Sequence, residues 1–311
     1  MEKLTENVQA ENRRNHDIAA CVSALLFVLA PTAVLAADWS DTSFGYRYGT
    51  HFQEPYDPHD ISKDIYSLTH SSGYKYGGNF FNVDMLKSEN GDPASGGGGN
   101  AQEVYVVYRT TLSGSAVFGT PLKFWGIIRD IGLTGGFDFN AKDDQFTSRV
   151  YKTYLGPQIS FEVPGFWNVA IEWRTESNHD WYATSAQFGG AGCVPSDSSV
   201  CNPNVRFQDT YAIESAWMIP FAVRSLPFKF QGFINYIGEK GRSGQGANSR
   251  PETLFETSLM YDLGSFIKHK DTVFVGVGYQ YWRNKYGNDA SKDPTGGSTA
   301  SAPQLELEWH F

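Results

Sequence analysis

Hydrophobic and polar residues alternate with a period of two along most of the chain. In the last such segment, 303–311, the apolar positions are Leu305, Leu307, Trp309 and Phe311, and the residues between them include two glutamates and a histidine. Successive side chains of a β-strand point to opposite faces, whereas a helix repeats its apolar positions every three to four residues. The pattern therefore predicts a chain built almost entirely of strands with one apolar face.

Twelve segments show this alternation, and we expect each to form one strand. Their ranges are 39–49, 65–71, 74–86, 102–112, 131–139, 148–161, 166–176, 207–218, 226–237, 252–262, 271–283 and 303–311. Most are about ten residues long, the length that a tilted strand needs to cross a bilayer. An even number of such antiparallel strands is typical of bacterial outer-membrane barrels.

The connections between the segments alternate between long and short. We expect long connections at 50–64, 87–101, 140–147, 177–206, 238–251 and 284–302. We expect short ones at 72–73, 113–130, 162–165, 219–225 and 263–270, with 113–130 the exception in length. Membrane barrels have short turns at one end and long loops at the other, whereas a soluble β-sandwich has no reason to alternate them. The sequence thus favours an all-β transmembrane antiparallel barrel over a soluble periplasmic β-protein, and Ser72-Gly73 fits a two-residue hairpin turn.

The first 36 residues resemble a cleaved leader rather than a part of the fold. Charged residues precede an apolar run over 18–35, and Ala36 and Ala37 supply the small residues of a cleavage site. A lipoprotein signal ending at Cys21 is the alternative, but polar residues precede that cysteine. We expect a signal peptide over 1–36 and a barrel over 37–311, where no apolar run reaches the length of a membrane-spanning helix.

The composition of the chain restricts the kinds of partner that it is expected to bind. Aromatic residues make up 15% of the chain, charged residues 19%, and the formal net charge is −9. An acidic protein is a poor partner for nucleic acid, because phosphates attract lysine and arginine. Removal of the leader would leave Cys193 and Cys201, which in an exported protein predict a disulfide. A redox or metal-binding pair is the alternative, but the C-x-x-C spacing is absent.

Signatures of enzymes are absent from the sequence. It contains no zinc-protease, nucleophile-elbow or nucleotide-binding motif, and its histidines lack the spacing of metal ligands. Asp57, His59 and Asp60 could hold a divalent cation, although a solvated turn is the simpler explanation. His70 and Ser71 are adjacent in a strand and so point to opposite faces, which argues against a hydrolase pair. We therefore predict no enzymatic activity, no cofactor and no bound metal.

The polar face of the strands holds the candidate binding residues. In a membrane barrel the apolar face contacts lipid and the polar face lines the lumen. Aromatic rings stack against flat solutes, while amides and charges hydrogen-bond the edges of those solutes. The residues predicted to line a solute path are Asn82, Asp84, Glu103, Tyr105, Arg109, Glu172, Arg174, Glu214, Lys229, Asn235, Gln280 and Trp282.

Several long motifs resemble the nucleoside-specific channel-forming family of outer-membrane proteins (Tsx-type). They are ADWSDTSFGYRYGT at 37–50, SGYKYGGNFFNVD at 72–84, QEVYVVYR at 102–109, GGFDFN at 135–140, FINYIG at 233–238 and GVGYQYWRNKYGN at 276–288. The resemblance covers essentially all of 37–311. It implies a twelve-stranded monomeric barrel with a narrow lumen that passes nucleosides by facilitated diffusion, and some members of the family serve as phage or colicin receptors. Trp309-His310-Phe311 is similar to the aromatic C-terminal signal that the barrel assembly machinery reads.

Together these features predict an outer-membrane channel of a Gram-negative bacterium for the passive diffusion of nucleosides or similar small polar solutes. Its other partners would be outer-membrane lipid and, through Phe311, the barrel assembly machinery. One alternative is a general small-solute porin. Another is a phage or colicin receptor whose loops, above all 177–206, carry the function.

Overall fold

The predicted strands are present in a computed structural model of the chain, which describes residues 37–311 except 90, 94–100, 143–147, 180–203 and 244–246. The strands are β1 (Trp39–Phe52), β2 (Ile61–Tyr74), β3 (Gly77–Ser88), β4 (Gln102–Ser113), β5 (Ile128–Lys142), β6 (Arg149–Phe161), β7 (Phe166–His179), β8 (Asn204–Arg206), β9 (Thr210–Val223), β10 (Leu226–Ile237), β11 (Glu252–Asp262), β12 (Val273–Arg283) and β13 (Thr299–His310). The predicted signal peptide, and the predicted disulfide between Cys193 and Cys201, lie outside the described residues.

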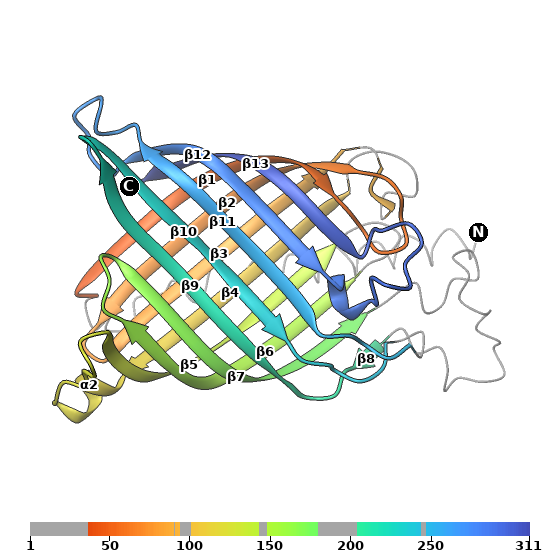
Figure 1. Cartoon of the computed structure of the whole chain (residues 1–311), viewed down its shortest axis with the longest axis horizontal. Helices are drawn as coiled ribbons and strands as arrows, with labels where there is room; N and C mark the ends of the chain where they lie inside the picture. The colour runs from red at the N-terminus through yellow and green to blue at the C-terminus, as the bar shows by residue number, and fades with distance from the viewer. Residues whose placement is uncertain (1–36, 90, 94–100, 143–147, 180–203, 244–246) are drawn as a thin grey trace, which may run out of the picture. The chain divides into compact units, whose positions relative to one another are not determined.

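The strands pair antiparallel and the sheet closes on itself. β1 pairs with β13, and β6 pairs with β7, so that the sheet has no free edge between them. Of the thirteen strands, β8 has three residues and pairs only with the end of β7. The other strands form the closed barrel of tilted strands seen in Figure 1. This confirms the predicted fold class, a twelve-stranded antiparallel barrel.

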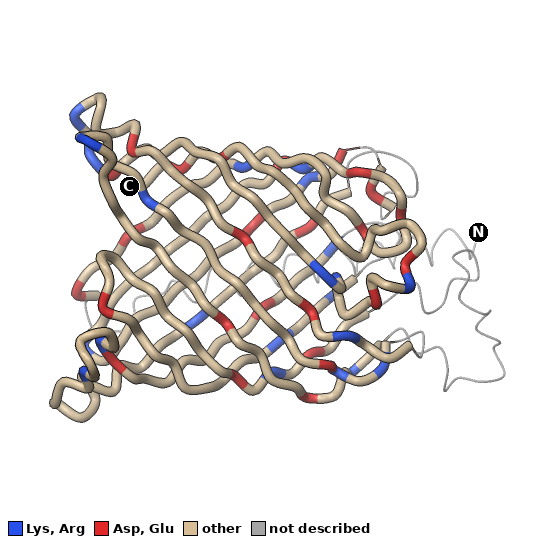
Figure 2. The backbone as a smooth tube through the Cα atoms, in the orientation of Figure 1, with Lys and Arg blue, Asp and Glu red and all other residues tan. Residues whose placement is uncertain are grey.

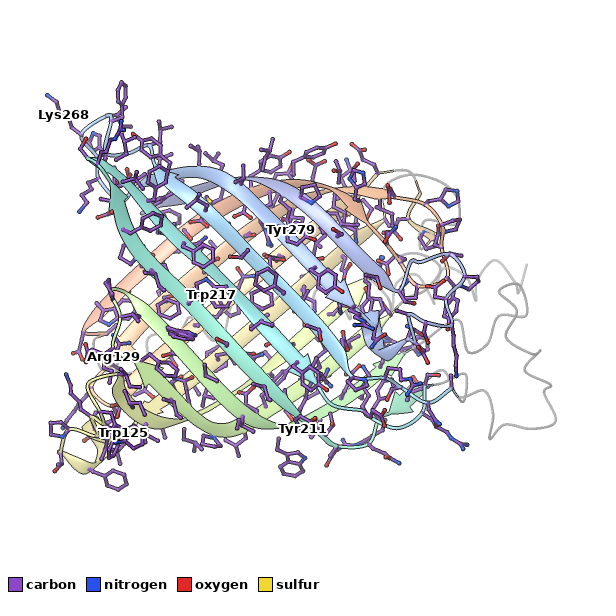
Figure 3. All side chains as sticks on the ribbon, in the orientation of Figure 1. Trp125, Arg129, Tyr211, Trp217, Lys268 and Tyr279 are labelled. Carbon is purple, nitrogen blue, oxygen red and sulfur yellow. The ribbon has the colours of Figure 1, made fainter. Side chains whose placement is uncertain are left out.

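The alternation along each strand sorts the side chains onto two faces. In β13, Leu305 is 62% exposed while its neighbour Gln304 is 3% exposed. Outward side chains such as Trp217 and Tyr279 cover the outer wall in Figure 3, and they are mostly apolar or aromatic. A barrel with an apolar outer surface and a polar interior is the arrangement required by lipid, since every backbone polar group is paired within the closed sheet.

The two ends of the barrel differ as predicted. At the short-turn end, β2–β3, β6–β7 and β9–β10 are joined by connections of a few residues, and the chain's two terminal strands also meet there, with Ser43 opposite His310. The two longer connections of this end are 114–127, which contains the helix α2 (Gly114–Phe118), and 263–272. The connections after β1, β3, β5, β7, β10 and β12 lie at the opposite, long-loop end. Among the described residues, no helix is both long and apolar enough to cross a membrane.

Several strand limits differ from those predicted. The predicted segments 65–71 and 131–139 are the middle parts of β2 and β5, and 207–218 is shifted in β9. The hairpin turn lies at Lys75-Tyr76 rather than at Ser72-Gly73, because Tyr74 still pairs with Gly77. Hydrogen bonding to a neighbouring strand continues beyond the residues that show the alternation, so the pattern marks a strand but not its ends.

One part of the lumen wall is apolar, which the polar-lumen prediction did not anticipate. Phe52, Ile61, Ile65 and Ala302 form a buried cluster near the long-loop end, and Leu86 packs against it. Phe52 is the last residue of β1. The cluster therefore fixes the point at which the connection between β1 and β2 leaves the wall.

Candidate functional site

The candidate residues from the sequence share the inward face of the barrel. Asp84 stands opposite Tyr105, and Glu214 stands opposite Asn235, in the registers of their strand pairs. Figure 2 shows charged residues in the middle of the strands as well as at their ends. The residues placed on this face by the strand registers are Asn82, Asp84, Glu103, Tyr105, Arg109, Glu172, Arg174, Glu214, Lys229, Asn235, Gln280 and Trp282. Solute binding by these residues stays a prediction.

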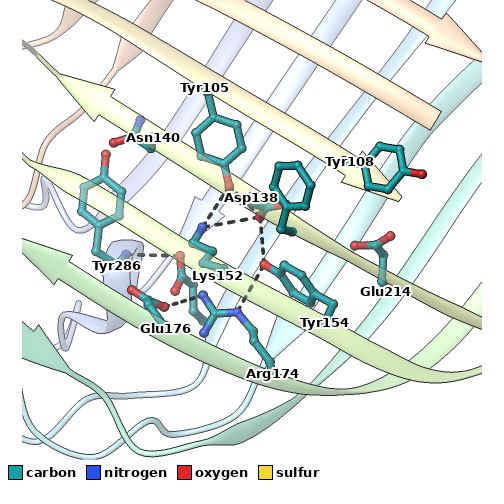
Figure 4. A network of polar contacts seen from close by, with 12 residues as sticks. Tyr105, Tyr108, Asp138, Asn140, Lys152, Tyr154, Arg174, Glu176, Glu214 and Tyr286 are labelled. Carbon is teal, nitrogen blue, oxygen red and sulfur yellow. Dashed lines mark hydrogen bonds and ion pairs between the residues drawn. The ribbon is translucent and has the colours of Figure 1, made fainter. Parts of the chain in front are cut away.

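A carboxylate that is not among the candidate residues, Asp138, lies within a network of polar contacts (Figure 4). Asp138 on β5 accepts hydrogen bonds from Arg109 at 2.8 Å and from the hydroxyls of Tyr105 and Tyr154 at 2.9 Å each. The ammonium of Lys152 lies 3.8 Å from the same carboxylate and donates to the Tyr105 hydroxyl at 2.9 Å. We name these five residues the Asp138 cluster.

Arg109 extends the Asp138 cluster across the lumen. Its second terminal nitrogen donates to Glu214 at 3.0 Å. Arg109 belongs to β4 and Glu214 to β9, and the order of the sheet places β5, β6 and β7 between them. The guanidinium also lies 4.1 Å from the centre of the Tyr154 ring. Such charge-assisted and cation–π contacts are stronger where water is scarce, so this arginine ties distant parts of the wall together.

A second network spans the lumen from β1. Arg47 pairs with Asp84 on β3 and with Glu256 on β11. Asn82 donates to Asp84 at 2.9 Å, and Gln280 donates to Glu256 at 2.7 Å. The side chains of Arg47, Asp84 and Glu256 are 15%, 17% and 16% exposed, so they keep some accessible surface inside the barrel. Asn82, Asp84 and Gln280 are thus brought together by an arginine that the candidate set did not include.

A third network lies toward the short-turn end. Lys229 and Gln231 on β10 both donate to Glu308 on β13, at 2.5 Å. His310 contacts Glu308 through one ring nitrogen at 3.3 Å and Asp41 through the other at 2.9 Å. Charges of both signs therefore follow one another along the length of the lumen, and each of the three networks joins side chains from different strands.

Packing becomes tighter toward the long-loop end. Arg174 donates to the Tyr154 hydroxyl at 3.3 Å and pairs with Glu176, and the two charged side chains are 1% and 6% exposed. Lys240, from the connection after β10, binds the same Glu176 at 2.9 Å. Trp282 donates to Glu252 at 2.7 Å. The charged side chains of the lumen are therefore more exposed at the level of Arg47 than at the level of Arg174.

The residues that the candidate set missed fall into two groups. Asp138, Lys152 and Arg47 obey the same alternation as their neighbours, so the inward face of β5, β6 and β1 predicts them. Glu54, which lies in the connection after β1 and contacts three lysines, follows no periodicity. The inward position of the first group could be predicted from the sequence, whereas the position of Glu54 depends on the path of the loop.

Glu172 is the least satisfied charged side chain of this region. It is 1% exposed, and neither carboxylate oxygen has a hydrogen-bond partner among the described residues. An unpaired buried carboxylate is costly. We expect Glu172→Gln to leave the free energy of unfolding unchanged or to raise it by up to about 1 kcal/mol, while Glu214→Gln, which weakens the contact to Arg109, lowers it by about 1–3 kcal/mol. Urea unfolding in detergent compares the two matched variants. A larger loss of the free energy of unfolding for Glu172→Gln than for Glu214→Gln would contradict the description of Glu172 as an unpaired carboxylate.

The candidate cation site does not assemble. His59 contacts Asp57 at 2.7 Å in an exposed turn, whereas Asp60 accepts from Gln53 at 3.2 Å instead. No group of three or more His, Cys, Asp or Glu side chains in the described part of the chain is placed to hold a metal ion. The turn is the better description of these residues.

Comparison with known proteins bears on the fold of the chain alone. No family model matches the chain, and no curated protein matches it. Among solved structures it is similar to an outer-membrane channel from Pseudomonas putida F1 (9% identity, 91% of this chain and 100% of that chain, TM-score 0.47). It is also similar to the KdgM porin in complex with disordered oligogalacturonate (10% identity, 86% of this chain and 99% of that chain, TM-score 0.39). A third similar structure is outer-membrane phospholipase A from Escherichia coli (9% identity, 90% of this chain and 93% of that chain, TM-score 0.41). Likeness at this level carries no argument about activity, and the resemblance to nucleoside channels stays a prediction.

Proposed function

We propose that the protein is an outer-membrane channel of a Gram-negative bacterium through which small polar solutes diffuse into the periplasm. The observation that carries this proposal is the partly exposed Arg47–Asp84–Glu256 network inside a closed barrel whose outer face is apolar. A charged interior surrounded by lipid-facing residues is the arrangement found in porins, whose lumen is a water-filled channel. The networks at Asp138 and Glu308 would continue the polar path in both directions.

The proposed solute class is nucleosides. Passage requires binding that is favourable enough to admit the solute and weak enough to release it, preferably at several sites in series. On the inward face of the barrel, Trp282 on β12 and Tyr105 on β4 offer aromatic rings, and Gln280 on β12 and Asn82 on β3 offer amides. Such groups suit a flat base and its edge. Since Asp138, Arg47 and Glu308 already have charged partners, a passing solute would exchange hydrogen bonds along the path without separating these ion pairs.

Conductance in a planar bilayer tests the proposal. The protein purified from outer membranes is expected to give small single-channel currents that adenosine blocks at a lower concentration than glucose. Trp282→Leu should raise the half-blocking concentration of adenosine about tenfold, since stacking on one ring is worth roughly 1–3 kcal/mol. Tyr279→Leu, on the outward face of the same strand, is the matched control and should change nothing.

Two outcomes would redirect the proposal. Equal block by adenosine and glucose would keep the channel and replace the nucleoside class by small solutes in general. Absence of current from folded protein would reject the channel, and the receptor function of the long loops would then be the better explanation.

A further inference from the structure

Near the long-loop end of the lumen, one carboxylate is surrounded by lysines. Glu54 lies in the connection between β1 and β2, and one of its oxygens is 3.2 Å from the ammonium of Lys285, 3.5 Å from that of Lys142 and 3.6 Å from that of Lys63. The three lysines come from the connection after β12, from the end of β5 and from β2. We name the three lysines the mouth lysines.

This group is almost completely removed from water. The exposed fraction of the side chain is 8% for Glu54, 5% for Lys63, 7% for Lys142 and 3% for Lys285. Asp92 pairs with Lys142 at 3.1 Å and its charge also acts on Lys63, while the charge of Glu103 acts on Lys285 and Lys142. Glu54 is the carboxylate that lies close to all three ammonium groups, so taking it away would leave the three buried cations with less negative charge than they need.

Glu54 is positioned by a loop and not by the barrel wall. Lys285 donates to the backbone carbonyl of Gln53 at 2.6 Å, and the backbone amide of Tyr56 donates to Asp293 at 3.0 Å. Gly297 passes so close to the Glu54 carbonyl that a Cβ there would lie 2.0 Å from its oxygen. Two long connections thus hold the carboxylate over the lumen, and a loop can withdraw more readily than a strand.

Charge balance at this place favours an ionised Glu54. Burial by itself would raise its pKa, but the charges of Lys285, Lys142 and Lys63 outweigh burial and hold the pKa below the ordinary range. Burial also lowers the pKa of Lys285, which Glu54 opposes. The carboxylate and the lysines stabilise each other, so neither is expected to leave without a substitute.

We propose that the mouth lysines are a binding site for an acidic solute, and that Glu54 occupies this site in the closed channel in the place of the solute's carboxylate or phosphate. The inference rests on the proposed channel function and goes beyond the nucleoside class by adding an acidic group to the solute. An arriving anion would replace Glu54, the connection between β1 and β2 would withdraw, and the lysines would remain neutralised throughout.

The surroundings indicate the rest of the solute. The ammonium of Lys285 lies 4.9 Å from the centre of the Trp282 ring and 5.1 Å from that of Tyr286. Trp282 and Tyr286 meet edge to face, with ring centres 5.0 Å apart. A ring-shaped body beside one acidic group fits this combination, as in a uronate or a nucleoside monophosphate, because the rings would face the body while the lysines hold the anion.

Recordings with paired probes test the proposal on the full-length protein purified from outer membranes. The pairs are glucuronate with glucose and adenosine monophosphate with adenosine. We expect the acidic member of each pair to block at a concentration about tenfold lower than the neutral one, the effect of about one desolvated charge contact. Glu54→Gln should lower the half-blocking concentration of glucuronate about tenfold and shift the reversal potential in a KCl gradient toward chloride, because the competing carboxylate is gone.

Further variants separate the site from general charge effects. Lys63→Gln should raise the half-blocking concentration of glucuronate and leave that of glucose unchanged. Lys123→Gln, an exposed lysine of the short-turn end, is the matched control and should alter neither. Heat-dependent mobility on gels verifies that each variant is folded, and Glu54→Gln provides the test if Lys63→Gln is not.

The outcomes distinguish the two proposals. Unchanged glucuronate block and reversal potential in Glu54→Gln, with adenosine block retained, would overturn the anion site and leave the channel intact. Equal block by the acidic and neutral probes would also overturn the anion site and leave the channel intact. A folded wild-type protein without current would overturn both.

Discussion

Replacing Arg109 by glutamine is expected to lower the free energy of unfolding by about 3–5 kcal/mol, the cost of leaving buried charges without their partner. Arg109 binds Asp138 at 2.8 Å and Glu214 at 3.0 Å, and its own side chain is 10% exposed. Without it, two carboxylates on β5 and β9, which are separated by β6 and β7, lose a shared cation. Tyr154 loses the guanidinium over its ring as well.

Unfolding in urea, followed by the loss of heat-dependent gel mobility in detergent, measures this effect. The double variant Arg109→Gln/Asp138→Asn should recover part of the loss, because it removes a carboxylate together with its cation. The free energy of unfolding of Arg109→Lys should lie between those of the wild type and Arg109→Gln. An ammonium can bind one of the two carboxylates, but it lacks the planar fork with which a guanidinium binds both. A loss below about 1 kcal/mol for Arg109→Gln would mean that the network contributes little beyond a surface ion pair.

Replacing Val277 by lysine is expected to destabilise the barrel in the membrane by about 2–4 kcal/mol and to reduce the amount of assembled protein. Val277 is 58% exposed and stands between Leu305 and Leu259 on the outward face. A lysine there would place its charge among lipid chains, where no described residue offers a counterion. Folding into bilayers of defined composition, read by urea midpoint, measures the loss.

Gln231→Lys is the matched control for this prediction. Gln231 faces inward and donates to Glu308 at 2.5 Å, so a lysine at this position keeps a donor beside a carboxylate. The same amino acid should therefore be tolerated on the inner face and rejected on the outer one. Equal destabilisation at both positions would contradict the assignment of the outer face to lipid.

The alternation of residues determined the class of fold and the two faces of the wall. Leu305 and Leu307 stand outside and Glu306 and Glu308 inside because successive side chains of a strand must point in opposite directions. Closure follows from the same pattern: an apolar face with paired backbone groups is stable in lipid only when no strand edge is free. The inward position of all the candidate lumen residues could accordingly be predicted, since it depends only on local geometry.

The contacts among those residues could not be predicted in this way. Arg109 reaches Glu214 across three intervening strands, and Glu54 meets Lys142 and Lys285 from parts of the chain far apart in sequence. The two-residue alternation indicates which face of the wall a side chain occupies. It does not indicate which residue lies opposite that side chain in the closed ring, or where a loop folds. The sequence by itself thus determined a barrel with a charged interior, while the closure of the ring and the path of the loops decided which charges meet, because those meetings depend on distances across the lumen and not along a strand.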